Sequence, residues 1–328
     1  MKPVLYICYT PYHVLATAAR VMAQPHPAQI FLSQRMTNRQ ALAARIESVN
    51  LFVKIIMVND SEWPAPATSG WRAALAHPLQ RWTVHRTGFR LHPEDYAEIC
   101  IYNDWSTMGR YLQDIGADYT LGEDTYNYMD HPHSWLEEQA LEPDYEERRK
   151  TGKGYLYWGA SRYCRVVEAG TPNRALYWPE RQRVFDTLAV LQNLDADQRA
   201  VLRRIFVEQE LPVPQRPTCL FLPRCFFVDN MVPSQAEQDR FCRDLVEKYA
   251  EGYQLYIKPH PRDPADFSAL FPQAIVLDRF MPSELLDYCF DLQFDRAVGL
   301  HTYSLRNLRC ADEIIDIPES ALAAYQNL

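Results

Sequence analysis

Two prolines frame a single histidine in the segment IKPHPRD, which follows a predicted strand in the second half of the chain. Pro259 and Pro261 favour extended backbone and remove amide donors, so they restrict where the side chain of His260 can point. Lys258 and Arg262 place positive charge on both sides of the histidine, which suits an anionic ligand such as a phosphate. The competing interpretation is a surface turn whose histidine has no function.

Adjacent acidic residues, Glu123 and Asp124, follow the short apolar piece YTL at another predicted strand end. A carboxylate held there can accept the proton of a hydroxyl nucleophile, and either residue fits that role. A solvated turn or a helix cap is the competing interpretation. Asp104, which follows Asn103 in IYNDWS, is a second-choice base or a residue that shapes a loop.

Two more polar segments stand in the second half of the chain. In GLHTYSL, Gly299 permits a tight turn, and Thr302 and Ser304 flank the start of a predicted helix. Hydroxyls and free amides at a helix start can hold a phosphate, or they can simply cap the helix. In MPSELL, Glu284 is placed to bind a pair of ribose hydroxyls or to act only as a favourable charge at a helix start.

The segment TPYHV follows the first predicted strand. Thr10 is expected to cap a helix that begins at the next residue, a proline. Tyr12 and His13 then fall in the first helical turn, where they either contact a substrate or pack on the sheet. Together with Asn103, these residues are the candidates for an acceptor or cleft surface.

The composition excludes several classes of protein. A length of 328 residues, with 47% hydrophobic and 23% charged residues, is typical of a folded chain of two domains. The net charge of −8 argues against nucleic acid as a partner. Eight cysteines without paired spacing indicate reduced thiols, not a disulfide framework or a zinc site.

No apolar stretch approaches the ~20 residues of a membrane span, and the opening MKPVLYICY reads as a buried strand, not a signal peptide. We therefore expect a cytoplasmic protein. Peripheral association with the inner face of the cytoplasmic membrane is left open, as is a homodimer.

Short apolar runs alternate with polar or helical segments in both halves of the chain: VLYICY, IFLSQ, VKIIMV and EICIYND, then CLFLP, YQLYIK, AIVLD and FDRAVG. This alternation predicts parallel sheets covered by helices on both faces. Residues 126–180 have no clean period and are predicted to form loops and short helices. Helical spacing returns from Arg181, a new helix is expected to start at Asp195, and PVPQRP at 212–217 predicts a linker.

The predicted fold is α/β, with two Rossmann-like parallel-sheet domains facing across a cleft. Residues 1–180 form the acceptor-side domain, and residues 181–216 form a helical connection and linker. Residues 217–328 form the nucleotide-sugar domain.

The order of the motifs resembles the bacterial sialyltransferases of GT-B fold, most closely glycosyltransferase family 52, the lipooligosaccharide sialyltransferase type. The polysialyltransferases and marine-type sialyltransferases share these motifs. The resemblance runs through YTPYHV, IYNDWS, the acidic pair, KPHPRD, MPSELL and VGLHTYSL. Two departures stand out, because Thr125 replaces the glycine that follows the acidic pair in those families and HTYS replaces their Ser-Ser pair.

The resemblance implies roles for residues. Glu123 or Asp124 would be the base, and a protonated His260 would meet the departing phosphate of a CMP-sugar. Nucleotide and donor binding would fall to residues of the later motifs: Lys258, Pro261, Glu284, His301, Thr302 and Ser304.

The implied reaction is an inverting transfer of sialic acid, or a related nonulosonic acid, from a CMP-sugar to a hydroxyl of a glycan, glycolipid or polysaccharide. No DxD-type metal dyad is evident among the motifs that carry the resemblance, so no cofactor or metal is expected. Two alternatives stay open: a GT-B transferase that uses CMP-Kdo or another CDP- or CMP-activated group, and a non-catalytic nucleotide-sugar binding protein. The acceptor, the linkage and the choice between lipopolysaccharide and capsule are left open.

Overall fold

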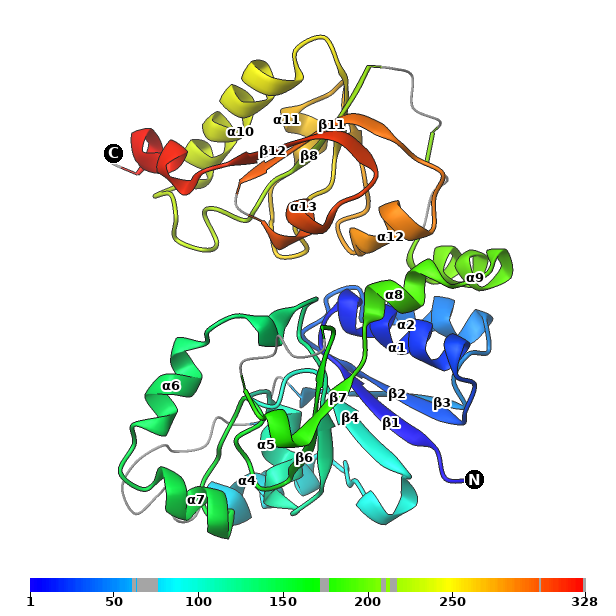
Figure 1. The fold of residues 1–328 in the computed structure, drawn as a ribbon, viewed down its shortest axis with the longest axis vertical. Helices are drawn as coiled ribbons and strands as arrows, with labels where there is room; N and C mark the ends of the chain where they lie inside the picture. The colour runs from blue at the N-terminus through cyan, green and yellow to red at the C-terminus, as the bar shows by residue number, and fades with distance from the viewer. Residues whose placement is uncertain are drawn as a thin grey trace. The chain divides into compact units, whose positions relative to one another are not determined.

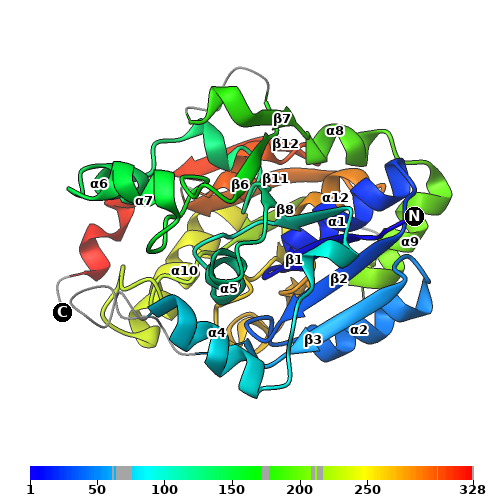
Figure 2. The ribbon, with the colours of Figure 1, turned by 90° about the horizontal axis from the view of Figure 1, so that it is seen from below.

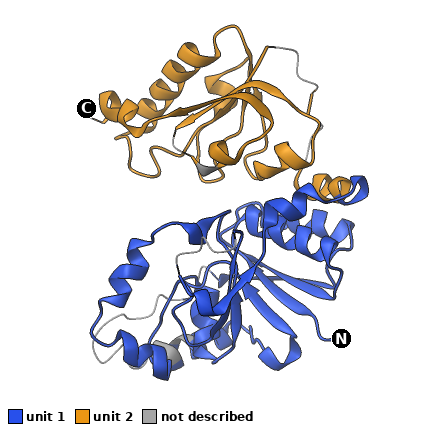
Figure 3. Ribbon diagram, in the orientation of Figure 1, with its two compact units in different colours: residues 1–198 blue, residues 199–328 orange. Residues whose placement is uncertain are grey.

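The computed structural model describes the chain except residues 61–62, 64–75, 172–176, 208–210, 213–216, 301 and 327–328. The chain divides into two compact units, Met1–Gln198 and Arg199–Leu328 (Figure 3). The connection expected at 181–216 is therefore divided between the units. Four residues of the expected linker, 213–216, lie outside the described part of the chain.

The first unit contains a seven-stranded parallel sheet in the order β3-β2-β1-β4-β5-β6-β7. Its strands are β1 (Val4–Cys8), β2 (Ala28–Ser33), β3 (Lys54–Val58), β4 (Glu98–Ile101), β5 (Tyr119–Leu121), β6 (Cys164–Ala169) and β7 (Gln182–Val184). The view in Figure 2 shows β3 and β7 at opposite edges of this sheet.

The helices of the first unit follow the strands in the order expected of a doubly wound sheet. They are α1 (Pro11–Ala23), α2 (Arg39–Ser48), α4 (Ala76–Arg86), α5 (Thr107–Asp114), α6 (Ser134–Ala140), α7 (Tyr145–Thr151) and α8 (Thr187–Gln192), and α9 (Ala196–Phe206) crosses the boundary between the units. Short 3-10 turns are η2 (Pro93–Asp95), η3 (Tyr128–Asp130) and η4 (Pro179–Arg181).

Alternate residues of β1 serve the two faces of the sheet. Leu5 and Ile7 belong to a core that includes Met108 of α5. Cys8 points the other way, with its Sγ 3.5 Å from Oγ1 of Thr17 in α1. Helices therefore cover both faces, with α1 and α2 on one side and α4 and α5 on the other (Figure 1).

The predicted strands of the first half are confirmed, but two local predictions are wrong. Residues 126–180 contain β6 inside the sheet, and β7 forms where helix was expected. The buried position of β6 is hard to recognise because it holds Glu168, which is only 3% exposed. That carboxylate is paired with Arg20 and Arg183, so charged residues occupy positions that apolar residues usually fill.

The second unit contains a five-stranded parallel sheet in the order β10-β9-β8-β11-β12. Its strands are β8 (Thr218–Leu222), β9 (Gln254–Ile257), β10 (Ile275–Val276), β11 (Phe294–Leu300) and β12 (Ala311–Ile317). Its helices are α10 (Gln235–Ala250), α11 (Phe267–Leu270), α12 (Glu284–Tyr288) and α13 (Tyr303–Asn307), and η5 (Glu319–Tyr325) packs against α10. Strand and helix residues such as Phe221, Phe241 and Val298 share one core.

All eight cysteines are buried and free, as the sequence predicts. Within the described residues, no helix is both long enough and apolar enough to span a bilayer.

Candidate functional site

The strand order of the first unit reverses between β1 and β4, and ligands of open parallel sheets bind outside the carboxyl ends of strands at such a point. The loops that follow β1, β4 and β5 all leave the sheet at this edge. They carry the TPYHV, IYNDWS and LGED segments. Thr10 serves as the predicted cap, because its Oγ1 accepts the backbone N–H of His13 at 3.2 Å.

His13 and Asp124 form a side-chain pair at this edge. Nε2 of His13 lies 3.0 Å from Oδ1 of Asp124 and 3.0 Å from the Asp124 carbonyl oxygen. Nδ2 of Asn103 lies 3.5 Å from the same carboxylate oxygen. The His13 side chain is fully buried, whereas the Asp124 side chain is 23% exposed, so the carboxylate can meet a substrate while the imidazole holds it from behind.

The backbone decides which nitrogen of His13 carries the proton. The N–H of Tyr9 donates to Nδ1 at 3.0 Å, so Nδ1 is an acceptor and the proton lies on Nε2. The ring stacks on Tyr102, with centroids 4.7 Å apart and planes 16° from parallel. These contacts aim the Nε2–H at Asp124, a fixed tautomer of the kind that orients catalytic carboxylates and histidines. Tyr12 lies beside this ring in an edge-on contact at 6.4 Å.

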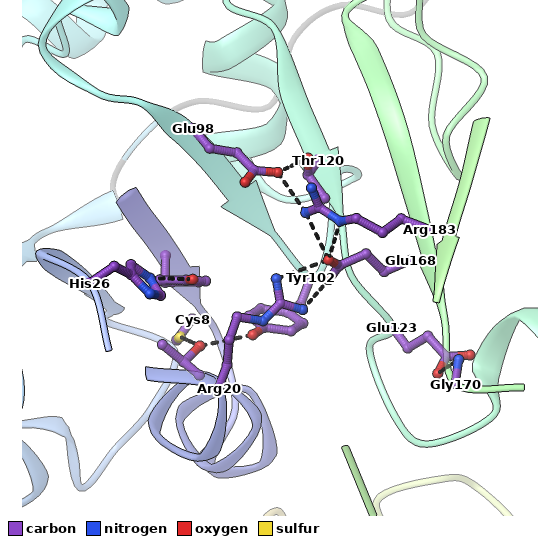
Figure 4. A network of polar contacts seen from close by, with 12 residues as sticks. Cys8, Arg20, His26, Glu98, Tyr102, Thr120, Glu123, Glu168, Gly170 and Arg183 are labelled. Carbon is purple, nitrogen blue, oxygen red and sulfur yellow. Dashed lines mark hydrogen bonds and ion pairs between the residues drawn. The ribbon is translucent and has the colours of Figure 1, made fainter. Parts of the chain in front are cut away.

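Glu123 has a different place from its neighbour. Its Oε2 accepts the N–H of Gly170 at 2.8 Å (Figure 4). Its Oε1 accepts the N–H of Met129 at 3.1 Å. The residue is 7% exposed, and burial raises the pKa of its carboxyl to about 7. A Cβ on Gly170 would stand 3.0 Å from Oε2, so only glycine allows this approach without a shift. Glu123 therefore closes the loop, which leaves Asp124 as the candidate base.

Asp104 also acts on loops. Its carboxylate accepts the backbone N–H groups of Trp158 at 2.7 Å and Gly159 at 2.9 Å, and the hydroxyl of Tyr119 at 3.0 Å. It is fully buried, and burial raises its pKa to about 6. Of the two roles left open for Asp104, its contacts match the shaping of a loop.

A buried ion network anchors the helix that carries His13. The guanidinium of Arg20 in α1 meets both carboxylate oxygens of Glu168 in β6, and Nη1 donates to Oε1 at 2.9 Å. Nε of Arg183 in β7 donates to the same carboxylate at 2.9 Å, and its Nη2 reaches Glu98 in β4 at 2.6 Å (Figure 4). The network ties α1 to three strands of the sheet and so fixes the position of His13.

In the second unit the strand order reverses between β8 and β11, and the IKPHPRD segment leaves the end of β9. Nζ of Lys258 donates to the carbonyls of Pro259 at 2.9 Å and Arg279 at 3.1 Å. The residue is 6% exposed, and burial lowers its pKa to about 8. Lys258 therefore holds the loop from inside, and its ammonium is directed at the backbone.

His260 is half-buried, and its Nδ1 accepts the backbone N–H of Arg262 at 3.2 Å. The proton of the neutral ring therefore lies on Nε2. Burial, followed by the charges of Arg262 and Lys258, lowers its pKa to about 4. The His260 ring is therefore neutral in the ligand-free chain at pH 7, because burial and neighbouring cations oppose a positive charge. A protonated His260 against the phosphate of a bound donor stays a prediction.

The remaining predicted donor residues follow β9, β10 and β11. Pro261 is exposed. Glu284 begins α12, where its Oε2 accepts the hydroxyl of Ser283 at 3.3 Å and burial raises the pKa of the carboxyl. Thr302 precedes α13 and Ser304 lies in its first turn, both half-buried. His301 lies outside the described residues.

One cation at this edge was missed by sequence reasoning. Arg224 comes two residues after β8, and its Nη1 lies 3.1 Å from Oε1 of Glu319. Its Nη2 is 3.9 Å from Asp229, which also pairs with Arg262 at 2.9 Å. The charge of Arg224 is one of those that lower the pKa of His260, after the effect of burial. An arginine just past the central strand in CLFLPRC was the available signal.

Among the described residues, no cluster of three or more His, Cys, Asp or Glu side chains is arranged to hold a metal ion. No family model matches the chain. A stretch of 72 residues is 33% identical to an uncharacterized protein from Haemophilus influenzae. The match covers 22% of this chain and 23% of that protein, so it spans about a quarter of the relative's length.

Solved structures with the same arrangement of elements include an α/β-galactoside α-2,3-sialyltransferase from the luminous marine bacterium Photobacterium phosphoreum. That comparison has a TM-score of 0.53 and 11% identity over 96% of this chain and 90% of the other. A protein named LpCGTa in complex with UDP gives a TM-score of 0.40, with 12% identity over 91% of this chain and 75% of the other. The UDP-GlcNAc 2-epimerase from Methanocaldococcus jannaschii gives 0.43, with 11% identity over 99% of this chain and 91% of the other.

The two parallel-sheet units and the similarity to the sialyltransferase structure confirm the predicted α/β class of GT-B type, with two Rossmann-like units. Membership of glycosyltransferase family 52 stays a prediction.

Proposed function

We propose that the chain is an inverting, metal-independent glycosyltransferase that moves sialic acid, or a related nonulosonic acid, from a CMP-sugar to a hydroxyl of a bacterial surface glycan. Asp124 is the base, His13 positions it, and His260 hydrogen-bonds the leaving phosphate. Arg224 and Arg262 supply further positive charge on the donor side.

The observation that carries the proposal is the pair of Asp124 and His13. A partly exposed carboxylate stands at the switch point of the first sheet, 3.0 Å from Nε2 of an imidazole whose tautomer is fixed by the backbone. Such a carboxylate has a free side for a substrate hydroxyl, and its orientation costs nothing at the moment of reaction. The neighbouring Glu123 lacks that freedom because both of its oxygens accept backbone N–H groups.

In the proposed reaction, the acceptor oxygen forms a bond to the anomeric carbon of the donor as its proton passes to Asp124. The bond between that carbon and the phosphate oxygen breaks with its electron pair, and CMP leaves from the opposite face, so configuration inverts. The Nε2–H of His260 donates a hydrogen bond to the departing phosphate oxygen, where negative charge develops.

The neutral state of His260 limits how it can assist departure of the phosphate. A ring with a pKa of about 4 is almost entirely neutral at pH 7 and lacks the second ring proton that a general acid would give up, but a bound phosphate would favour its protonated form. We therefore assign to His260 the role of a hydrogen-bond donor to the phosphate. In the complex with the donor, its protonated form can also act as a proton donor.

Two assays test the proposal. CMP and CDP should raise the melting temperature, because a ligand that binds the folded chain at about 100 times its dissociation constant adds about 2.7 kcal/mol of stability. Release of CMP from CMP-sialic acid in the presence of EDTA should fall in His260→Asn and persist in His92→Asn, a control at an exposed histidine.

The outcomes separate the alternatives. Stabilisation by UDP or GDP but not by CMP would contradict the proposed donor. Turnover with CMP-Kdo in place of CMP-sialic acid would keep the transferase and change its sugar. CMP binding without any transfer or hydrolysis would favour a non-catalytic binding protein, and loss of activity in EDTA would contradict metal independence.

A further inference from the structure

Tyr102 follows β4, and its ring packs against His13 and against the loop that carries Asp124. The ring and the imidazole stack with centroids 4.7 Å apart and planes 16° from parallel. The ring also fills the space beside Gly122, two residues before Asp124. A Cβ on that glycine would stand 2.7 Å from Cδ1 and 2.8 Å from Cε1 of Tyr102. The position of one aromatic ring therefore affects how the histidine and the carboxylate meet.

Contacts at its hydroxyl keep the ring of Tyr102 in place. The residue is 3% exposed, and its hydroxyl oxygen lies 2.8 Å from Oγ1 of Thr17, which is one turn after His13 in α1. Oγ1 of Thr17 in turn lies 3.5 Å from Sγ of Cys8 at the end of β1 (Figure 4). The ring is thus anchored to the helix that carries His13 and to the central strand of the sheet.

The tilt of the His13 ring depends on its packing. The hydrogen bond from the N–H of Tyr9 fixes the tautomer, but rotation about the bond between Cβ and Cγ of a histidine has no strong preference of its own. Nε2 lies 3.0 Å from both Oδ1 and the carbonyl oxygen of Asp124, so a small turn would direct its N–H to the carbonyl instead of the carboxylate. A flat partner on the face of the imidazole opposes such a turn, because stacked rings lose contact when one of them tilts.

The contacts of Tyr102 indicate packing, not proton transfer. Its hydroxyl meets Thr17, whereas its ring meets His13. Burial raises the pKa of the hydroxyl well above its ordinary value, so the residue is neutral at the pH of the assays. Tyr102 therefore acts on Asp124 through His13.

We propose that Tyr102 is a positioning residue for the base, and that Gly122 is required because it makes room for the Tyr102 ring. The face of the ring holds the His13 imidazole at the tilt that directs Nε2–H to the carboxylate of Asp124. The assignment rests on the proposed function, in which Asp124 accepts the proton of the acceptor. It adds a requirement for a flat ring at position 102 and for glycine at position 122.

Substitutions at position 102 separate the ring from the hydroxyl. Tyr102→Phe keeps the flat face, so kcat for CMP release from CMP-sialic acid, with lactose as the acceptor, should stay within about threefold of the original. Tyr102→Leu removes that face, so kcat should fall at least about tenfold while KM for CMP-sialic acid changes less than about threefold. The effect falls on kcat because the residues assigned to the donor belong to the second unit.

Gly122→Ala tests the same contact from the side of the loop. The backbone of Gly122 is not left-handed, and the next atom that the added Cβ would meet, Oε2 of Glu168, is at an ordinary 3.6 Å. The alanine should therefore act by displacing the Tyr102 ring, and kcat should fall at least about tenfold. In the Tyr102→Leu chain the same alanine should cost less than about threefold, because the ring that it would displace is gone.

Nuclear magnetic resonance reports the tilt of His13 without any substrate. The Nε2–H of His13 is buried and donates to a carboxylate, so it should exchange slowly and give an imidazole N–H signal in a chain made with ¹⁵N-labelled histidine. The chain has nine histidines, and His13→Gln identifies the signal as the one that disappears. We expect Tyr102→Phe to retain this signal and both Tyr102→Leu and Gly122→Ala to lose or shift it.

The matched control is Tyr111→Leu. Tyr111 is a fully buried tyrosine of the first unit whose ring packs on Trp63 and Phe89. Its loss should lower the melting temperature, as Tyr102→Leu does, but it should leave kcat within about threefold and the His13 signal in place. Far-UV circular dichroism shows whether each variant folds, and Gly122→Ala keeps the test valid if Tyr102→Leu does not.

The inference is overturned if Tyr102→Leu keeps kcat within about threefold, if Tyr102→Phe or Tyr111→Leu loses as much kcat as Tyr102→Leu, or if Gly122→Ala costs the same with and without the Tyr102 ring. Its failure is distinct from failure of the proposed function. A chain without turnover whose His13 signal is lost in Tyr102→Leu would refute the transferase and keep the positioning by Tyr102. Turnover in the original chain, with a His13 signal that stays unchanged in Tyr102→Leu, would refute the positioning alone.

Discussion

Replacing Glu123 by glutamine tests whether this acid builds the loop that presents Asp124. Burial raises the pKa of Glu123 from 4.5 to about 7. Between these two pH values, the folded chain keeps a proton that the unfolded chain has already lost. The residue therefore contributes stability below about pH 4.5, and that contribution is lost as the pH rises through about 7. At about 1.4 kcal/mol per unit of pKa, the whole loss is about 3 kcal/mol, of which about 2.5 kcal/mol falls between pH 5 and pH 8.

Glu123→Gln removes this titration but keeps the size of the side chain. An amide has one acceptor oxygen, so only one of the N–H groups of Met129 and Gly170 keeps its partner, at a cost of about 1–3 kcal/mol. The original chain should be the more stable one at pH 5. On moving to pH 8, the difference should change by about 2.5 kcal/mol in favour of the glutamine variant.

Urea unfolding at the two pH values, followed by tryptophan fluorescence, measures this difference in the first unit alone. All seven tryptophans lie within its bounds: Trp63, Trp71, Trp82, Trp105, Trp135, Trp158 and Trp178. Glu138→Gln, at an exposed position of α6, is the control and should behave alike at both pH values. If the difference between the original chain and Glu123→Gln is the same at pH 5 and pH 8, the buried, protonated Glu123 of this account is wrong.

Three other changes probe the remaining parts of the site. In His13→Gln, the new side chain cannot both accept the N–H of Tyr9 and donate to Asp124 at the original geometry. CMP release should therefore fall about 10²-fold while the affinity for CMP stays unchanged. A loss of CMP affinity would contradict a role confined to the first unit. A bound phosphate raises the low pKa of His260, so calorimetry should detect a rise in CMP affinity as the pH falls from 8 to 5. His260→Asn should abolish this rise. A pH dependence that persists in the variant would show that another group causes it. Arg20→Met leaves the buried carboxylate of Glu168 with one cation fewer. The free energy of unfolding of the first unit should therefore fall by about 3 kcal/mol, as measured by tryptophan fluorescence in urea. A loss below about 1 kcal/mol would show that the ion network adds little stability.

Most of the strands and several local features could be predicted from the sequence because they depend on residues that are neighbours in the chain. Thr10 caps α1 as expected. Asp195 and Gln198 cap the start of α9 reciprocally, each side chain accepting the other's backbone N–H at 3.0 Å or less. Apolar runs predicted most strands of both sheets for the same reason, since burial on both faces leaves a local pattern, but they did not predict β6, β7 and β12.

The roles of the other site residues could not be predicted because they depend on contacts with residues far away in the sequence. Glu123 and Asp124 are adjacent and similar, and their roles separate only through partners elsewhere in the chain: Gly170 for one and His13, 111 residues away, for the other. Lys258 has the position in the motif that suggests a phosphate ligand, but a carbonyl 21 residues away turns its ammonium inward. The charge state of His260 depends on burial by the surrounding loops, which a residue pattern does not display.

The most direct test of the central claim compares Asp124→Asn with Glu123→Gln in single assays of CMP release from CMP-sialic acid with a neutral disaccharide acceptor at pH 8. Removal of a base is typically worth ~10²–10⁴ in rate, so Asp124→Asn should lose at least 10²-fold in turnover. Glu123→Gln should keep turnover within about tenfold of the original, because its effect is on the loop and on stability. Equal losses in both variants, or the larger loss in Glu123→Gln, would contradict the assignment of Asp124 as the base.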